Sequence, residues 1–110
     1  METTETFSYR TCPIYLIEFD LEEAKGNLRF DKENLRNINE QLTTAMSQLQ
    51  GYEMTHDLDT LNSYQRGVYR RIRSYAEDLV TTKLRVKQAI KYEKSQIKKL
   101  KEVLKARDAQ

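Results

Sequence analysis

The chain has 110 residues, of which 38% are hydrophobic and 33% are charged, and its net charge is only +2. A chain of this length is one domain at most, and so high a charged fraction excludes a globule with a large buried core. The single cysteine excludes an internal disulfide, and no run of about 20 apolar residues is present to form a transmembrane helix.

The first predicted element is a long helix over residues 13–50. Leucine recurs every seven residues, and a second, mostly apolar position follows each leucine three residues later; together these positions are Leu21, Ala24, Leu28, Asp31, Leu35, Ile38, Leu42, Ala45, Leu49 and Tyr52. This spacing predicts the a/d seam of a coiled coil. Pro13 suits the first turn of a helix. Asp31 is a polar residue in the seam, so it needs an arginine nearby or a wet edge.

A break over residues 51–57 separates this helix from a second one over about 58–107. Gly51 directly follows the last seam leucine and predicts a helix C-cap, whereas Thr55 and Asp57 are candidate N-caps for the next helix. The second helix has its own apolar row: Leu58, Leu61, Val68, Ile72, Tyr75, Leu79, Val86, Ala89, Ile90, Ile97, Leu100 and Leu104. Two long amphipathic helices around one short break predict an all-α fold, a single domain over residues 1–110 built as an antiparallel two-helix coiled-coil hairpin.

The sequence offers little for catalysis. His56 is the only histidine, and with Asp57 and Asp59 it could be drawn as a metal cluster. Zinc sites need three or four nitrogen or sulfur ligands, so a turn leading into a helix is the preferred interpretation. Cys12 has no histidine nearby to activate it. We therefore expect no enzymatic activity, no catalytic residue, no cofactor, no metal and no small-molecule substrate.

Residues 61–72, LNSYQRGVYRRI, gather arginine and tyrosine near the expected turn. No acid occurs between Asp59 and Glu77. Tyrosine and arginine are the residues that most often anchor protein interfaces, and a hairpin turn has few partners within the molecule. The cluster therefore predicts a partner-binding patch. The alternative is that the tyrosines only cover the seam and the arginines are solvated.

The charge is distributed unevenly along the chain. Residues 13–50 carry seven acids and four bases, whereas residues 83–107 carry ten bases and two acids. Such a basic segment could contact nucleic acid. Its bases alternate with apolar residues around the helix, as on a solvated coiled-coil surface that faces an acidic helix. Nucleic-acid binding is therefore the unlikely alternative, and membrane-surface binding is weaker still because the apolar row lacks bulky aromatic residues.

The segments FSYR, LEEAKGNL, NSYQRGVYRRI and KYEKSQIKKLKEVLKAR occur in this order. In this order they resemble the FliJ family of flagellar export proteins and, through it, the YscO/SctO stalk proteins of type III secretion. Family members are similar to this chain in three features: an aromatic and basic N-terminal segment, a Tyr-Gln pair early in the second helix, and a lysine-rich C-terminal segment. The matching positions are Phe7, Tyr9, Arg10, Tyr64, Gln65, Val68, Tyr92, Glu93, Lys94, Lys99, Leu100, Lys101 and Glu102.

This resemblance implies a cytoplasmic coiled-coil stalk, peripheral at the cytoplasmic face of the inner membrane. Its partners would be the export ATPase ring, the membrane export-gate protein and export chaperones. The lysines over residues 91–105 would face the ring. The resemblance and the arginine cluster together give the predicted partner-binding residues: Tyr52, Tyr64, Gln65, Arg66, Val68, Tyr69, Arg70 and Arg73. The alternative function is a small helical-hairpin chaperone or a scaffold subunit.

Overall fold

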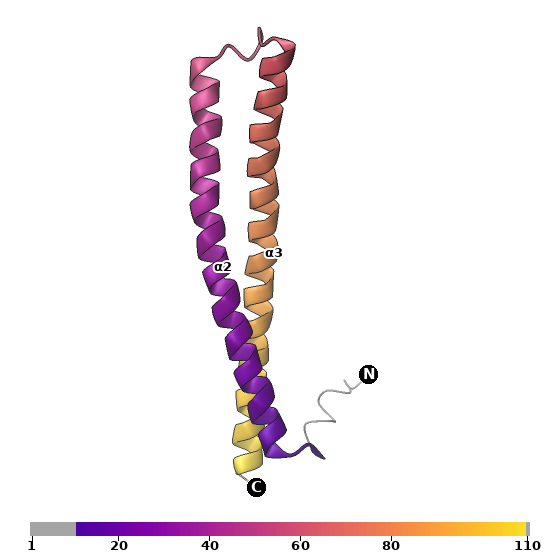
Figure 1. Ribbon diagram of the computed structural model, residues 1–110. Coiled ribbons are helices and arrows are strands. Elements are labelled where there is room, and N and C mark those ends of the chain that lie inside the picture. The colour runs from indigo at the N-terminus through magenta and orange to yellow at the C-terminus, as the bar shows by residue number, and fades with distance from the viewer. Residues whose placement is uncertain (1–10, 110) are drawn as a thin grey trace. The chain divides into compact units, whose positions relative to one another are not determined.

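The computed structural model describes residues 11–109, which contain two long helices and no strand. Helix α2 spans Ile14–Thr55 and helix α3 spans Ser63–Asp108 (Figure 1). The all-α helical hairpin predicted from the sequence is therefore confirmed. The motif residues Phe7, Tyr9 and Arg10 lie outside the described residues.

Helix α2 continues past the position at which the sequence predicted its end. Gly51 is an interior helical residue without the positive φ of a C-cap glycine, so that prediction is wrong. A Cβ at Gly51 would meet no packed neighbour within 4 Å, so nothing around this position requires a glycine. Thr55 is the last residue of α2, and its Oγ1 donates to the carbonyl oxygen of Gly51 at 2.9 Å. The turn therefore covers residues 56–62 rather than 51–57.

Helix α3 begins later than predicted because Asn62, and neither Thr55 nor Asp57, caps it. The backbone N–H of Gln65 donates to Oδ1 of Asn62 at 2.8 Å, and the N–H of Asn62 donates to Oε1 of Gln65 at 3.0 Å. This reciprocal capping box satisfies two helix-end donors. Asp57 instead shapes the turn, where its Oδ1 accepts from the N–H of Asp59 at 3.1 Å.

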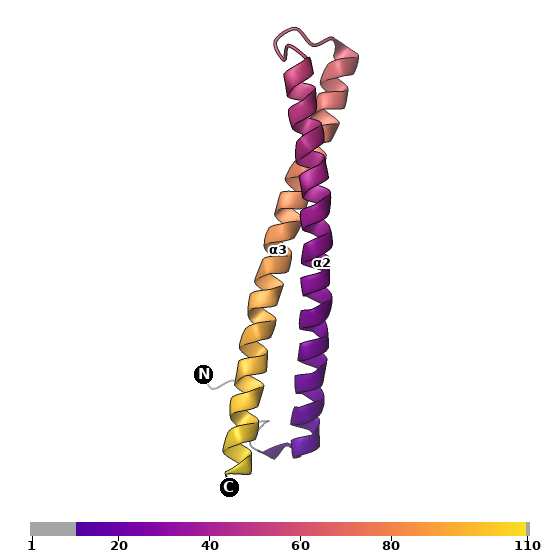
Figure 2. The same ribbon diagram turned by 90° about the vertical axis from the view of Figure 1, so that its left-hand side faces the viewer.

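The chain divides into two compact units, and each has its own small core. Of the described residues, the terminal unit contains 11–32 and 88–109, and the turn unit contains Glu33–Lys87. In the terminal unit, the start of α2 lies beside the end of α3 (Figure 2). Its buried cluster is surrounded by half-buried apolar residues, and together they are Ile17, Leu21, Leu100, Cys12, Ala24, Ile97, Val103 and Leu104.

A hydrogen bond joins the segment before α2 to the last turn of α3 within the terminal unit. Nη1 of Arg107 donates to the carbonyl oxygen of Cys12 at 2.7 Å. Helix α2 starts one residue after Pro13, whose carbonyl oxygen accepts from the N–H of Leu16 at 3.0 Å. The Cys12 thiol is half-buried, and its Sγ lies 3.3 Å from the Pro13 carbonyl oxygen. These contacts fix the first residues of α2 next to the last turn of α3.

The buried cluster of the turn unit combines alanines with leucines. It consists of Ala45, Ala76 and Leu79, with Leu42 packed against it. Ala45 is only 1% exposed, so the helices approach closely at this alanine, as small residues permit. Tyr75, which the sequence placed in the apolar row, is exposed instead. Ala45 is a seam position of the predicted heptad, whereas Ala76, next to the predicted Tyr75, was not in the predicted apolar row.

Alanine at Gly51 or Gly67 is expected to stabilise the fold. Both glycines are helical, and an added Cβ would meet nothing within 4 Å at either position. Each substitution should raise the free energy of unfolding by about 0.5–1 kcal/mol, because glycine is a poor helix former. Urea unfolding followed by circular dichroism measures the change. A loss of stability in either variant would contradict the open surroundings of that glycine.

Candidate functional site

Two of the predicted binding tyrosines hold the turn unit together. Oη of Tyr52 donates to the carbonyl oxygen of Gln65 at 3.0 Å. The Tyr52 ring stacks on His56 with ring centroids 3.9 Å apart, and the Tyr69 ring lies 5.8 Å from it. Oη of Tyr69 donates to Oε2 of Glu53 at 3.3 Å. The Tyr52–Gln65, Tyr52–Tyr69 and Tyr69–Glu53 contacts join the end of α2 to the start of α3. Figure 1 shows these two helix ends on either side of the turn.

Other predicted binding residues are directed to solvent. Tyr64 is 75% exposed, and Arg66 and Arg70 are also exposed. Within residues 11–109, neither of these two arginines has an acidic partner, whereas Nε of Arg73 lies 3.0 Å from Oε1 of Glu77. Val68 and Gln65 are half-buried, and the Gln65 side chain is used in the capping box. Fewer residues are therefore exposed for binding a partner than the sequence predicted.

A shallow cleft lies beside these arginines. It has a volume of about 270 Å³ and is lined by two leucines, a tyrosine and three arginines: Leu58, Leu61, Arg66, Tyr69, Arg70 and Arg73. We call it the turn cleft. Sequence reasoning assigned Leu58 and Leu61 to the helix seam and missed them as site residues. Because residues 56–62 are not helical, Leu58 is exposed at the cleft instead.

The chemistry of the turn cleft suits an acidic, partly apolar ligand. Arg66 and Arg70 are four residues apart on one helix, so their like charges repel each other by roughly 0.2–0.5 kcal/mol. A carboxylate between them would remove that cost and accept directional hydrogen bonds from the guanidinium groups. Leu58 and Leu61 add apolar area below the charges. The cleft can thus bind a carboxylate and an aliphatic group together.

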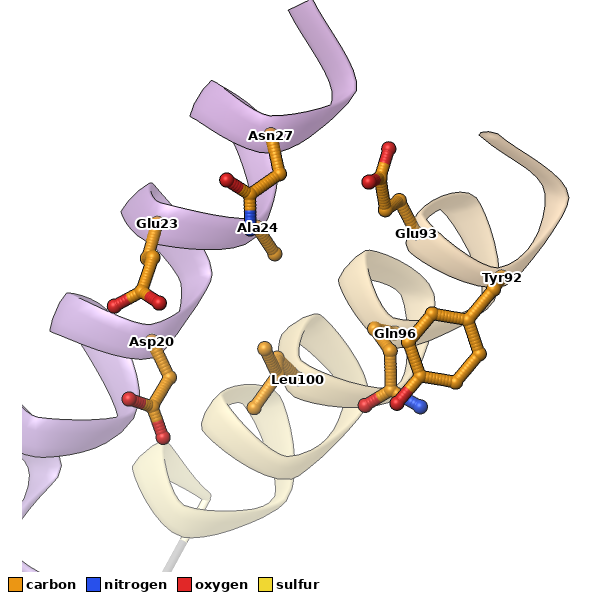
Figure 3. Close-up of a pocket in the computed structure, with 8 residues that line it drawn as sticks. All are labelled: Asp20, Glu23, Ala24, Asn27, Tyr92, Glu93, Gln96 and Leu100. Carbon is orange, nitrogen blue, oxygen red and sulfur yellow. The ribbon is translucent and has the colours of Figure 1, made fainter. Parts of the chain in front are cut away.

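A second cluster of charged residues lies in the terminal unit. Glu93 extends from α3 beside α2, where the acids Asp20 and Glu23 line the same pocket (Figure 3). Its Oε2 is buried without a hydrogen-bond partner. Burial first, and then hydrogen bonding and charge from Asp31, raise the pKa of Glu93 from 4.5 to about 7. Asp31 therefore faces another carboxyl group, whereas the sequence predicted a nearby arginine or a solvent-exposed edge.

His56 takes no part in a cluster of metal ligands. Its Nδ1 lies 3.1 Å from the carbonyl oxygen of Tyr52 and 3.0 Å from Oγ1 of Thr55, so it covers the end of α2. Among residues 11–109, no three His, Cys, Asp or Glu side chains are grouped as metal ligands would be. The histidine therefore contributes to the turn rather than to a metal centre in this part of the chain.

Neither described helix combines the length and the apolar character needed to cross a bilayer. Comparisons of this chain with protein-family models, with curated proteins and with solved structures find no match.

Proposed function

We propose that the chain is a non-enzymatic coiled-coil stalk of a flagellar or type III protein-export ATPase complex. It would couple the ATPase ring to the membrane export gate and handle export chaperones. The observation that supports this proposal best is the turn cleft, where Arg66 and Arg70 remain exposed without an acidic partner among the described residues. A protein that presents unpaired arginines and an exposed leucine at a turn has a surface suited to protein recognition.

In this proposal each part of the hairpin has a separate task. The turn cleft would bind an acidic segment of the export gate or of a chaperone. The exposed lysines late in α3, such as Lys91, Lys94 and Lys98, would complement acidic groups inside the ATPase ring. ATP would be bound and hydrolysed by the partner. The stalk would supply rigid spacing and electrostatic fit, and none of its own side chains would react.

The double variant Arg66→Gln/Arg70→Gln is expected to lose binding of the export-gate protein by at least about tenfold, because two charge-assisted contacts are removed. These positions are preferable to Tyr69, whose hydroxyl group already bonds Glu53. The matched control is Arg85→Gln/Lys87→Gln, which removes two exposed positive charges elsewhere on α3. Pull-down of the gate protein, with circular dichroism as a check of helix content, measures the effect.

Stimulation of the cognate export ATPase is the second measurement. The full chain should raise the ATP turnover of the ATPase without hydrolysing ATP alone. Unchanged turnover, together with equal pull-down by both double variants, would contradict the stalk proposal. Co-purification with one secreted protein would favour the chaperone alternative. Binding to RNA that falls steeply with salt would favour the nucleic-acid alternative.

A further inference from the structure

The outer face of α2 in the terminal unit carries a row of exposed aromatic rings. Tyr15, Phe19 and Phe30 are 69%, 64% and 70% exposed. Phe19 and Phe30 are eleven residues apart, close to three full helical turns, so they lie on one face about 16 Å apart. The packed side of the same helix is formed by other residues, including Ile17 and Leu21. Two phenylalanines exposed to this degree in one row are unusual for a surface without a partner.

Gly26 lies between the two rings on the same face. A Cβ at this position would approach only Nη2 of Arg29, the far end of a flexible side chain, at 3.9 Å. Since Gly26 has no side chain and little surrounds it, a second helix could approach the backbone closely at this position. The aromatic rings on either side would then flank the crossing point. We call the surface formed by Tyr15, Phe19, Gly26 and Phe30 the aromatic face.

Charges beside the aromatic face favour contact with an antiparallel copy of the same helix. Residues 18–23 contain four acids and no base, of which Glu18 and Glu22 are exposed. Beyond Gly26, the exposed base Arg29 lies on the same side of the helix as Glu22, and the exposed acid Glu33 is paired with Arg36 of its own helix. An antiparallel copy of the same helix would place its Glu22 against Arg29 and its Arg29 against Glu22, which satisfies the condition for a twofold symmetric contact.

From these observations we propose that the aromatic face binds a second copy of this chain, with α2 packed antiparallel on α2 about a twofold axis near Gly26. Phe19 of each copy then lies next to Phe30 of the other. Glu22 of each copy lies opposite Arg29 of the other. The four phenylalanine rings become buried, and the intramolecular pair of Glu22 with Lys25, at 3.4 Å and exposed, costs little to rearrange.

This association is separate from the proposed function, because the residues of the turn cleft take no part in it. Sedimentation of the full chain from about 10 µM to about 1 mM tests the proposal, since small interfaces dissociate in this range. We expect a concentration-dependent dimer. Phe19→Ser/Phe30→Ser should raise the dissociation constant at least about tenfold. Tyr92→Ser, which removes an exposed ring from α3, should leave it unchanged.

Charge reversal tests the antiparallel arrangement. Glu22→Arg alone and Arg29→Glu alone should each weaken the dimer, because each puts like charges opposite each other. An equimolar mixture of these two single variants should restore it, since every arginine then meets a glutamate of the other copy. A parallel pairing would leave each single variant as strong as the wild-type chain. That result, a monomeric wild-type chain at the highest concentration, or a dimer insensitive to Phe19→Ser/Phe30→Ser would overturn the proposal.

Discussion

Replacement of Ile17 by alanine is expected to lower the free energy of unfolding by about 2–4 kcal/mol. Ile17 is 0% exposed and is the largest side chain described as fully buried. It packs with Leu21 and Leu100 in the terminal unit, where few other residues are buried. A small domain is stable by only about 5–15 kcal/mol, so this one change should remove a large share of the total.

Urea unfolding followed by circular dichroism and by tyrosine fluorescence measures this loss. The matched control is Leu16→Ala, which removes a similar number of methyl groups from a neighbouring exposed position of the same helix. The control should cost less than about 1 kcal/mol. Equal losses in both variants would mean that the small cluster around Ile17 does not hold the terminal unit together.

Stability should also fall as the pH rises towards 7, because of Glu93. Its pKa is about 7 in the folded chain and 4.5 in its ordinary state, so the folded chain holds a proton that the unfolded chain has released. The stabilising effect is complete below pH 4.5 and is lost as the pH rises through 7. Above that pH, Glu93 is ionised beside Asp31, with Asp20 and Glu23 as further acids of the same region.

Glu93→Gln is expected to remove this dependence, because glutamine is neutral at every pH and can donate to Asp31. Since the pair lies partly in solvent, screening limits the gain at pH 8 to about 1 kcal/mol. For a chain of this size that gain is a rise of roughly 5 °C in Tm. Thermal unfolding at pH 4.5 and pH 8 measures it, with the exposed acid variant Glu102→Gln as the control. Parallel pH profiles of the wild-type chain and Glu93→Gln would contradict the coupling of the two carboxyl groups.

The helical hairpin could be predicted from the sequence because it depends on a repeated pattern rather than on single residues. The seven-residue leucine repeat and the single break fix two helices and their antiparallel packing within each unit. The positions of the helix ends were harder to predict from the sequence. Gly51 suggested a stop, although a glycine ends a helix only where the backbone turns into the left-handed region, and α2 does not turn there.

The candidate site was partly visible in the sequence. The arginine cluster could be recognised because its residues are close together in the sequence. Its exposure follows from its place near the start of α3. The contacts across the turn could not be predicted from the sequence. Nothing in the spacing of its residues shows that Tyr52 bonds the backbone of Gln65 or that Tyr69 reaches Glu53. The cap of α3 could have been found, because an Asn followed three residues later by a Gln is the pattern of a capping box.

The stacked rings at the turn have a spectroscopic consequence. The chain has one histidine, and the planes of its ring and the Tyr52 ring differ by only 9°. Protons held above the plane of an aromatic ring are shielded, so the His56 ring signals should lie apart from those of free histidine in a proton NMR spectrum. Any ligand that opens the turn would return these signals towards their free positions. A single resonance can therefore report occupancy of the turn without an attached label.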